Sequence, residues 1–434
     1  MSGLSKILPN SAGIDIGSEK VFVAVENQSV KNFRTFTASY RELGNYLKEC
    51  KITHVAMEST GIYWLTLYDI LEEMGFDVTL VNPIDCKNLP GRKTDVQDCQ
   101  WIQQLFSYGL LRKSFIPKDV VRKLRVFTRM REDKLQMAAS HINHMQKALI
   151  QMNIRLPEVL SQINGASGMA MIRAILAGER DANLLLTYCT SNLRKRKGKD
   201  ILMALEGNYK EEYLFELQQA YEGYMFYLEQ VRKCDAEAEK VLIEFKSQSG
   251  KNYKDDNPIK PIRHNKPEIK DLHELILDIQ GANPTILPGL TDYSVMRLTA
   301  ELGNDLKIWA TVKVFVSWLG LAPGKNMSGK INKRSKKRPV TKAGQIFMQA
   351  AQSLLISKNN GLGAFARRIK ARRGSKIAIK ATARKLAELY YKMFSEGMQY
   401  VEEGVKAYEE KIKQQQIKSL LRRANELNFQ VIVN

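Results

Sequence analysis

The sequence predicts a three-part protein: an α/β N-terminal domain (10–116), central coiled-coil helices (117–248) and, after a linker (249–268), a mostly α-helical C-terminal domain (269–400) with a helical tail (401–434). Three observations predict this organisation. Short apolar runs alternate with helical patterns near the start. Two long stretches then repeat apolar residues at helical spacing. Finally, 434 residues with 44% hydrophobic content can form several cores, which excludes a disordered chain.

The N-terminal elements follow in a clear order. AGIDIG and VFVAVEN read as two short strands around the turn GSEK, and FRTFTA as a third strand. The segment YRELGNYLKECK reads as a helix, THVAMES as a buried strand, 62–74 as a helix and 77–81 as a strand. A further helix begins near Asp95. Three strands followed by alternating helix and strand predict an α/β sandwich.

The central region is predicted to be two long helices, 117–163 and 205–247. Apolar residues recur at spacings of three and four, as in Leu135, Ala138 and Ile142. This pattern indicates a coiled-coil seam or a helical hairpin, and it leaves open whether the partner helix belongs to the same chain. The basic run RKRKGK (194–199) is expected to form a loop at the tip.

In the C-terminal region, ILPGLTDYSVMRLTAEL (286–302) places a Pro-Gly turn between two helical stretches. That pattern suits a helix-hairpin-helix, whose turn amides can face a phosphate. An ordinary tight turn between helices fits equally well.

The distribution of charge indicates a polyanionic partner. The formal net charge is +21, and residues 306–387 contain 20 Lys and Arg but no Asp or Glu. A surface helix usually mixes both signs, whereas a long stretch of cations alone repels itself unless phosphates neutralise it. Phe347 and Phe365 are among its few aromatic residues, so stacking on single strands is not the main binding mode expected of this stretch.

The sequence predicts a cytoplasmic, nucleoid-associated protein with no membrane partner. There is no apolar run of 18 residues, and MSGLSKILPN lacks the apolar core of a signal peptide. The five cysteines are scattered without a CxxC motif, which is typical of free thiols in a reducing compartment, and the histidines do not cluster as zinc ligands do.

Four acidic residues are candidate metal ligands. Asp15 lies in the first strand between Ile14 and Ile16, so it projects from the face opposite theirs. Glu58 ends a buried strand, and Asp95 and Asp98 share one helix face. Carboxylates are suitable ligands for Mg²⁺ or Mn²⁺. Taken singly, each acid could instead be a turn or helix-cap residue, but a carboxylate amid apolar residues needs a partner or a metal.

These motifs resemble a known family. Asp15, Glu58, Asp95 and Asp98 match the DEDD pattern of a RuvC-like, RNase H-type domain. GIDIG, AMESTGIYW and VNP followed by GRKTDVQDCQWIQQL are similar to the DEDD transposases of insertion sequences, the group that includes the Piv invertase. LPGLTDYSVMRLTAELG, FVSWLGLAPGKNMSGK and KAGQIFMQAA are similar to the C-terminal transposase domain of that family. The resemblance covers roughly 10–115 and 280–395.

The resemblance implies a serine nucleophile. Ser328, followed by Gly329, would attack a DNA phosphate and form a phosphoserine link, with divalent metal on the four acids beside it. Family members often carry a second glycine where this chain has Lys330. Without the resemblance, Ser-Gly in a basic loop is simply a turn. The hydroxyls of Ser335, Ser59 and Thr60 are rivals, Thr60 most of all because it is close to Glu58 in sequence.

The resemblance also implies the partners: donor and target DNA, a bridge RNA encoded by the bacterial element, and a homo-oligomer, expected as a dimer of dimers with composite sites. Guide pairing would choose the sites, so the protein itself needs little base readout. Cations near the acids and the serine are candidate phosphate contacts, or else plain surface charges: Arg92, Lys93, Lys325, Lys330, Lys333, Arg334, Lys336, Lys337 and Arg338.

Two other functions remain open. In a metal-dependent RNase H-like nuclease or junction resolvase, the four acids would activate water and Ser328 would have no role. In a non-catalytic nucleic-acid-binding scaffold, Asp15→Ala or Asp98→Ala would leave all function intact.

Overall fold

The structure is a computed structural model of the 434-residue chain, which divides into two compact units, 1–116 and 117–434. Each unit is described here by itself. The structure describes residues 5–58, 61–82, 94–323, 326–328, 331–333, 339–357, 360–427 and 429. Of residues 326–328, 331–333, 400–409, 411, 412 and 416 it describes the backbone alone.

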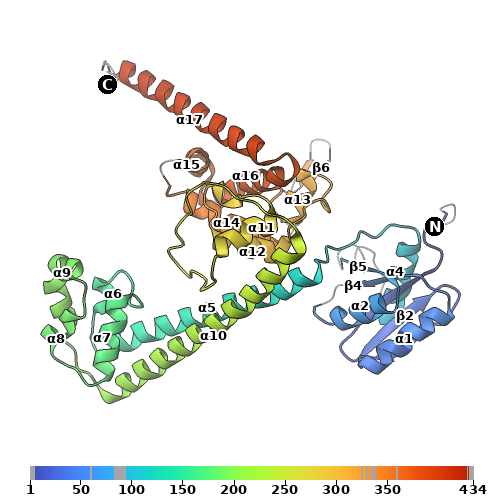
Figure 1. Cartoon of the computed structure of the whole chain (residues 1–434), viewed down its shortest axis with the longest axis horizontal. Helices are drawn as coiled ribbons and strands as arrows, with labels where there is room; N and C mark the ends of the chain where they lie inside the picture. Colours follow the sequence, from blue (N-terminus) through green and yellow to red (C-terminus); the bar gives the residue numbers. More distant parts are fainter. Residues whose placement is uncertain are drawn as a thin grey trace. The chain divides into compact units, whose positions relative to one another are not determined.

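The N-terminal unit is built on a five-stranded mixed sheet with the strand order β3-β2-β1-β4-β5 (Figure 1). The first three strands form an antiparallel meander, and β4 and β5 add to β1 in parallel. Their bounds are β1 Ser11–Ile16, β2 Lys20–Val25, β3 Lys31–Arg34, β4 His54–Glu58 and β5 Asp77–Val81. The third strand was predicted at 33–38, but β3 begins earlier, at Lys31, and is shorter. It ends at Arg34 because the next helix already begins at Thr37.

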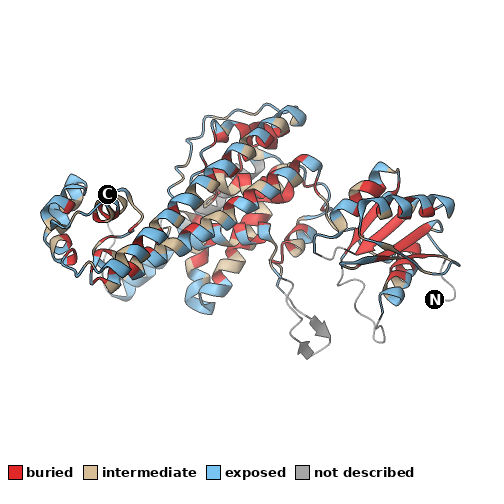
Figure 2. Cartoon of the chain, turned by 90° about the horizontal axis from the view of Figure 1, so that it is seen from below, coloured by how far each residue is buried: buried red, intermediate tan, exposed pale blue. Residues whose placement is uncertain are grey.

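Helices cover both faces of this sheet, so its central strands are buried on both sides (Figure 2). On one face, α1 (Thr37–Glu49) and α2 (Trp64–Glu73) pack Leu43 and Leu67 into a core with Ile14 and Met57. On the other face lies α4 (Asp95–Ser107), whose Ile102 and Phe106 pack on Ala56 and Val81. Because side chains alternate along a strand, neighbouring residues of β1 and β4 face different helices.

The C-terminal unit contains two long helices that pack side by side, α5 (Asp119–Gln151) and α10 (Glu211–Ser249) (Figure 1). The two helices approach closely at Gly223, against which the ring of His141 rests. α5 ends at Gln151, well before the predicted end at residue 163, and Asn153 just after it takes a left-handed φ of 58°. The coiled-coil interpretation between chains stays a prediction.

A small cluster of short helices connects the end of α5 to the beginning of α10. It consists of α6 (Leu156–Val159), α7 (Ala166–Leu176), α8 (Ala182–Thr187) and α9 (Ser191–Ala204). The prediction of a loop at 194–199 is wrong, because these residues lie inside α9. Arg and Lys are good helix formers, and buried Ile201 and Ala204 attach α9 to the cluster.

The remaining elements of this unit are mostly helical. They are α11 (Leu272–Gln280), the 3₁₀ turn η1 (Pro284–Ile286), α12 (Asp292–Leu302), α13 (Val312–Trp318), the hairpin β6 (Asn326–Ser328) and β7 (Ile331–Lys333), α14 (Lys342–Leu354), α15 (Gly361–Arg373), α16 (Ser375–Ser395) and α17 (Met398–Glu426). α12 begins after the predicted Pro-Gly turn, where Thr291 and Ser294 cap each other's amides. The helix-hairpin-helix interpretation stays a prediction.

The segment 250–271 contains no helix or strand, yet it packs along the helices. The Tyr253 amide donates to Asp278, the Lys260 ammonium to the Leu287 carbonyl, and the Glu268 amide to Asp235. These contacts hold the expected linker against α10, α11 and η1.

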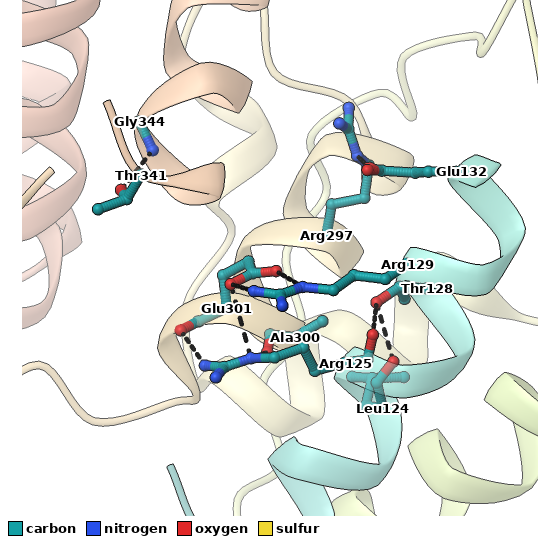
Figure 3. Close-up of polar contacts among 10 residues, drawn as sticks. All are labelled: Leu124, Arg125, Thr128, Arg129, Glu132, Arg297, Ala300, Glu301, Thr341 and Gly344. Atoms are coloured by element: carbon teal, nitrogen blue, oxygen red, sulfur yellow. Dashed lines mark hydrogen bonds and ion pairs between the residues drawn. The ribbon is translucent and has the colours of Figure 1, made fainter. Parts of the chain in front are cut away.

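A network of arginines and glutamates fixes α12 against α5 (Figure 3). Arg129 donates from Nε and Nη2 to the two carboxylate oxygens of Glu301, at 2.8 and 2.9 Å, and Arg125 donates to the Glu301 carbonyl oxygen at 2.8 Å. Arg297 of α12 pairs in turn with Glu132 of α5. Two-pronged arginine–carboxylate contacts fix orientation as well as distance, so this junction is geometrically defined.

Among the described residues, none of the helices is both long and apolar enough to cross a lipid bilayer.

Candidate active site

Asp15 lies near the end of β1, the middle strand of the N-terminal sheet. Its neighbours Ile14 and Ile16 are buried in the core under α1 and α2. Because side chains alternate, Asp15 points to the opposite face, where α4 lies, and it is half-buried there. The strand pattern read from the sequence therefore gave the correct face for this carboxylate.

Glu58 ends β4, the strand parallel to β1. Ile14 is paired with Met57, so the next residues, Asp15 and Glu58, lie at the same level on adjacent strands. Met57 faces α1 and α2, whereas Ala56 packs on α4; Glu58 shares the face of Ala56. Only 6% of Glu58 is exposed. Two carboxylates thus lie side by side at the carboxyl edge of the sheet.

α4 brings the other two acids to this edge because it runs antiparallel to β1. The side-chain amide of Gln103 donates to the carbonyl of Ser11 at the start of β1, so the beginning of α4 lies towards the end of β1, near Asp15. Thr94 caps the helix by accepting from the Gln97 amide. Asp95 and Asp98 occupy the first turn, with Asp95 exposed and Asp98 partly buried.

Gly13 allows α4 to lie this close. A Cβ at Gly13 would come within 2.2 Å of the Gln103 amide nitrogen and 2.4 Å of the Cys99 carbonyl oxygen, both on the α4 backbone. Only glycine fits there. The sequence analysis did not single out Gly13, although a glycine inside a strand is a known sign of close backbone approach. It lies two residues before Asp15, on the same face.

The electrostatics of the site are those of crowded negative charge. Burial, the largest cause, and the charges of Glu58, Asp95 and Asp98 together raise the pKa of Asp15 from 3.8 to about 6. Burial and the neighbouring Asp15 also raise the pKa of the Cys99 thiol to about 12, which keeps that thiol neutral. The other three predicted acids therefore all act electrostatically on the Asp15 carboxylate.

This donor set fits a hard divalent cation in its chemistry. Oxygen ligands from carboxylates suit Mg²⁺ or Mn²⁺, and a cation would relieve the repulsion that raises the Asp15 pKa. Within the described part of the chain, however, no three His, Cys, Asp or Glu side chains come close enough together to form a ready-made metal cage. We weigh the charge crowding above this, because Mg²⁺ keeps several waters and is bound through few direct carboxylate ligands.

The predicted nucleophile and its cations belong to the second unit. Ser328 is the last residue of β6, and its backbone pairs with Ile331; Lys333 ends β7 and pairs with Asn326. The serine therefore lies in a short hairpin, which the sequence analysis had read as a turn. The candidates that lie outside the described residues are Ser59, Thr60, Arg92, Lys93, Lys325, Lys330, Arg334, Ser335, Lys336, Lys337 and Arg338.

Comparison with known families gives two matches. Residues 12–154 match a DEDD transposase model of the IS110 type, described as "Transposase", and residues 285–367 match the model described as "Transposase IS116/IS110/IS902 family". No curated protein matches the chain. The two models occur in the expected order and cover both units, and the mixed sheet followed by helices fits an RNase H-like domain at the N-terminus. Together they support a transposase that acts on DNA. The chain therefore belongs to the DEDD transposases of the IS110 family.

Proposed function

We propose that this transposase is an RNA-guided recombinase that cuts and rejoins donor and target DNA through a covalent phosphoserine at Ser328, with Mg²⁺ or Mn²⁺ held by Asp15, Glu58, Asp95 and Asp98. One observation carries the metal part of the proposal. Burial and the charges of Glu58, Asp95 and Asp98 raise the pKa of Asp15 to about 6, and no arginine or lysine of the described residues is among the causes of that shift. Acids that face acids are typical of sites that bind cations.

In the proposed reaction the protein supplies both a nucleophile and a carboxylate site. When bound, a divalent cation polarises the phosphate and helps to deprotonate the serine hydroxyl. The Ser328 Oγ loses its proton and forms a bond to phosphorus, while the bond from phosphorus to a deoxyribose oxygen breaks and that oxygen takes up a proton. Attack by a deoxyribose hydroxyl of the other DNA then reverses these steps. The number of phosphodiester bonds is conserved, so no nucleotide cofactor is consumed.

The nucleic-acid partners follow from charge. The acid-free stretch 306–387 includes the end of α15, where Lys370, Arg372 and Arg373 are exposed or partly exposed. Such cations hold phosphate backbones without reading bases. A bridge RNA that pairs with donor and target would supply the sequence specificity. We place this assembly on the bacterial nucleoid as a dimer of dimers, with the acids of one subunit serving the Ser328 of another.

Adduct trapping tests the serine intermediate. The full chain, co-expressed with the RNA of its element, is incubated with labelled donor and target DNA in Mg²⁺ and then denatured. We expect a DNA-linked protein band that disappears in Ser328→Ala and falls at least about 100-fold in Asp15→Asn, the scale lost when catalytic groups are removed. Ser335→Ala and Thr60→Ala are the matched hydroxyl controls and should keep the adduct.

The other outcomes identify the rivals. Metal-dependent cleavage without an adduct, unaffected by Ser328→Ala, would mean a nuclease that uses water. Binding with no metal-dependent strand exchange in any variant would mean a scaffold. Sequencing the RNA that copurifies with the chain tests the guide: an RNA that maps beside the gene supports it, and a random RNA population refutes it.

A further inference from the structure

A second site of interest is a cavity of about 610 Å³ within the C-terminal unit. It lies where the ends of α10 and α16 meet the segment that follows α12, and Lys118, before α5, also lines it. None of its lining residues belongs to the DEDD set, and Ser328 is not among them. Its volume is within the range of cavities that take small organic ligands.

Three lysines line this cavity, together with one acid. Burial lowers the pKa of Lys251. The positive charges of Lys118 and Lys307 lower this pKa further, whereas the negative charge of Asp305 opposes the shift. The Lys251 ammonium donates to the Gln280 carbonyl at 3.0 Å, and one Asp305 oxygen accepts from the Lys307 amide at 2.9 Å. In the part of the chain described, Lys118 and Lys307 have no ion-pair partner within 4.0 Å. The pocket therefore carries an excess of positive charge that an anion would neutralise.

Three aromatic residues line the same pocket: buried Phe245 and the more exposed Tyr391 and Phe394. The Tyr391 hydroxyl donates to the Trp309 carbonyl at 2.6 Å, and its ring packs on Phe315. The Phe394 ring packs on buried Tyr390, with 5.1 Å between ring centroids. Both rings are held by the core and remain partly exposed. Fixed, partly exposed rings offer flat apolar surface at little entropic cost.

We infer that this pocket binds one unpaired nucleotide of a single-stranded nucleic-acid segment, with its phosphate at Lys118, Lys251 and Lys307 and its base against Tyr391 or Phe394. Cations together with aromatic rings are how proteins bind unpaired nucleotides. Inorganic phosphate alone would not use the rings, and a paired base in a duplex could not reach them. The inference rests on the nucleic-acid partner of the proposed function, but on neither Ser328 nor metal.

Fluorescence binding tests the pocket separately from the chemistry. The full-length Ser328→Ala chain in EDTA is titrated into a single-stranded decanucleotide, RNA or DNA, that carries one internal 2-aminopurine. We expect quenching of the base on binding. Lys307→Gln should reduce the slope of log affinity against log salt by about 0.7, as for one lost phosphate contact with a single strand. Lys233→Gln, at an exposed lysine of α10 outside both the pocket and the acid-free stretch, is the matched control and should leave the quenching intact.

A second variant removes the space but no charge. Ser395, which lines the pocket and is exposed, is replaced by Leu, a larger side chain without a ring on which a base could stack. We expect about tenfold weaker binding and loss of quenching, because the base can no longer stack on the aromatic rings of the pocket. Lys118→Gln repeats the charge test if Lys307→Gln changes the thermal unfolding midpoint. Equal effects of Lys307→Gln and Lys233→Gln, or full quenching in Ser395→Leu, would overturn the inference.

Competition by other ligands tests whether the bound nucleotide belongs to a single strand. Adenosine monophosphate and inorganic phosphate should compete only weakly, and the fully paired duplex should not quench. A free mononucleotide that binds as tightly as the decamer would contradict the strand-bound nucleotide proposed here. Adduct formation by the Ser328 chain is scored independently, so failure of one proposal does not imply failure of the other.

Discussion

Buried acids occur in both units, but their neighbours differ. In the C-terminal unit, Asp235 of α10 and Arg131 of α5 are each 1% exposed, and the Arg131 Nε donates to Asp235 Oδ1 at 2.5 Å. The Glu268 amide also donates to Asp235, and the guanidinium lies 4.7 Å from the centre of the Tyr293 ring. In the N-terminal unit, the charges that act on Asp15 come from other carboxylates.

The difference separates acids that hold helices together from the acids of the proposed metal site. A buried carboxylate with a matched cation orients two helices, as Glu301 does for α5 and α12 (Figure 3). A carboxylate among carboxylates costs folding free energy, and such a cost persists where the site serves another purpose. Burial alone would not distinguish Glu58 from Glu301, which are 6% and 7% exposed.

The largest effect is expected where the paired acid is removed. Asp235→Ala leaves the Arg131 charge buried without its carboxylate, so the free energy of unfolding should fall by about 3–5 kcal/mol. Urea denaturation of the full chain measures it. Glu237→Ala, which breaks the exposed pair with Lys240 on the same helix, is the control and should leave the midpoint nearly unchanged. Equal effects of both variants would remove the distinction between buried and exposed pairs.

A smaller loss of folding stability is expected from a change at the contact between α4 and β1. Gly13→Ala forces the α4 backbone away, which should cost about 1–3 kcal/mol. It should also move Asp95 and Asp98 away from Asp15, so stabilisation by added Mg²⁺ should weaken. Thermal unfolding with and without Mg²⁺ measures both effects. Gly198→Ala on α9, where a Cβ would make only an ordinary contact of 3.8 Å with Leu186, should show neither. Normal Mg²⁺ stabilisation in Gly13→Ala would mean that the helix position does not set the site.

The smallest expected effect is a gain in folding stability, the opposite of the two losses above. With the folded pKa of Asp15 raised to about 6, the folded protein binds the proton more tightly than the unfolded chain does, so stability falls as pH rises from about 4 to about 6. In EDTA, Asp15→Asn should therefore match the parent below that window and exceed it by about 1–2 kcal/mol above it. Urea titrations across pH measure this. Glu19→Gln, at an exposed acid before β2, should show no such gain.

Added metal should reverse the effect of the Asp15 carboxylate on the stability of the protein. Added Mg²⁺ should stabilise the parent and not Asp15→Asn, because ligand binding favours the folded state. An Asp15→Asn variant that is less stable than the parent at pH 8 in EDTA would show that this carboxylate has a structural partner, and the contrast between the two units would fail.

The sequence predicted most of the sheet because alternation along strands is a local signal. The strand 77–81 and the face of Asp15 were correctly predicted for this reason. The loop expected at 194–199 was wrong because charge density carries no information on helix formation. The hairpin around Ser328 was missed, since three-residue strands are too short to show a period. The extent of α5 was overestimated because helical spacing continues into α6 across a left-handed residue.

The sequence by itself determined the family, the alternation that puts Asp15 and Glu58 on one face, and the excess of positive charge, because each of these depends on residue type and local order. The tertiary structure alone decided which charges lie around Asp235 and around Asp15. Arg131 and Asp235 are 104 residues apart, and Asp15 is brought to Asp95 and Asp98 only by the packing of α4 at Gly13. Charge–charge interactions depend on distance in space, and the chain order does not specify that distance until the helices have packed.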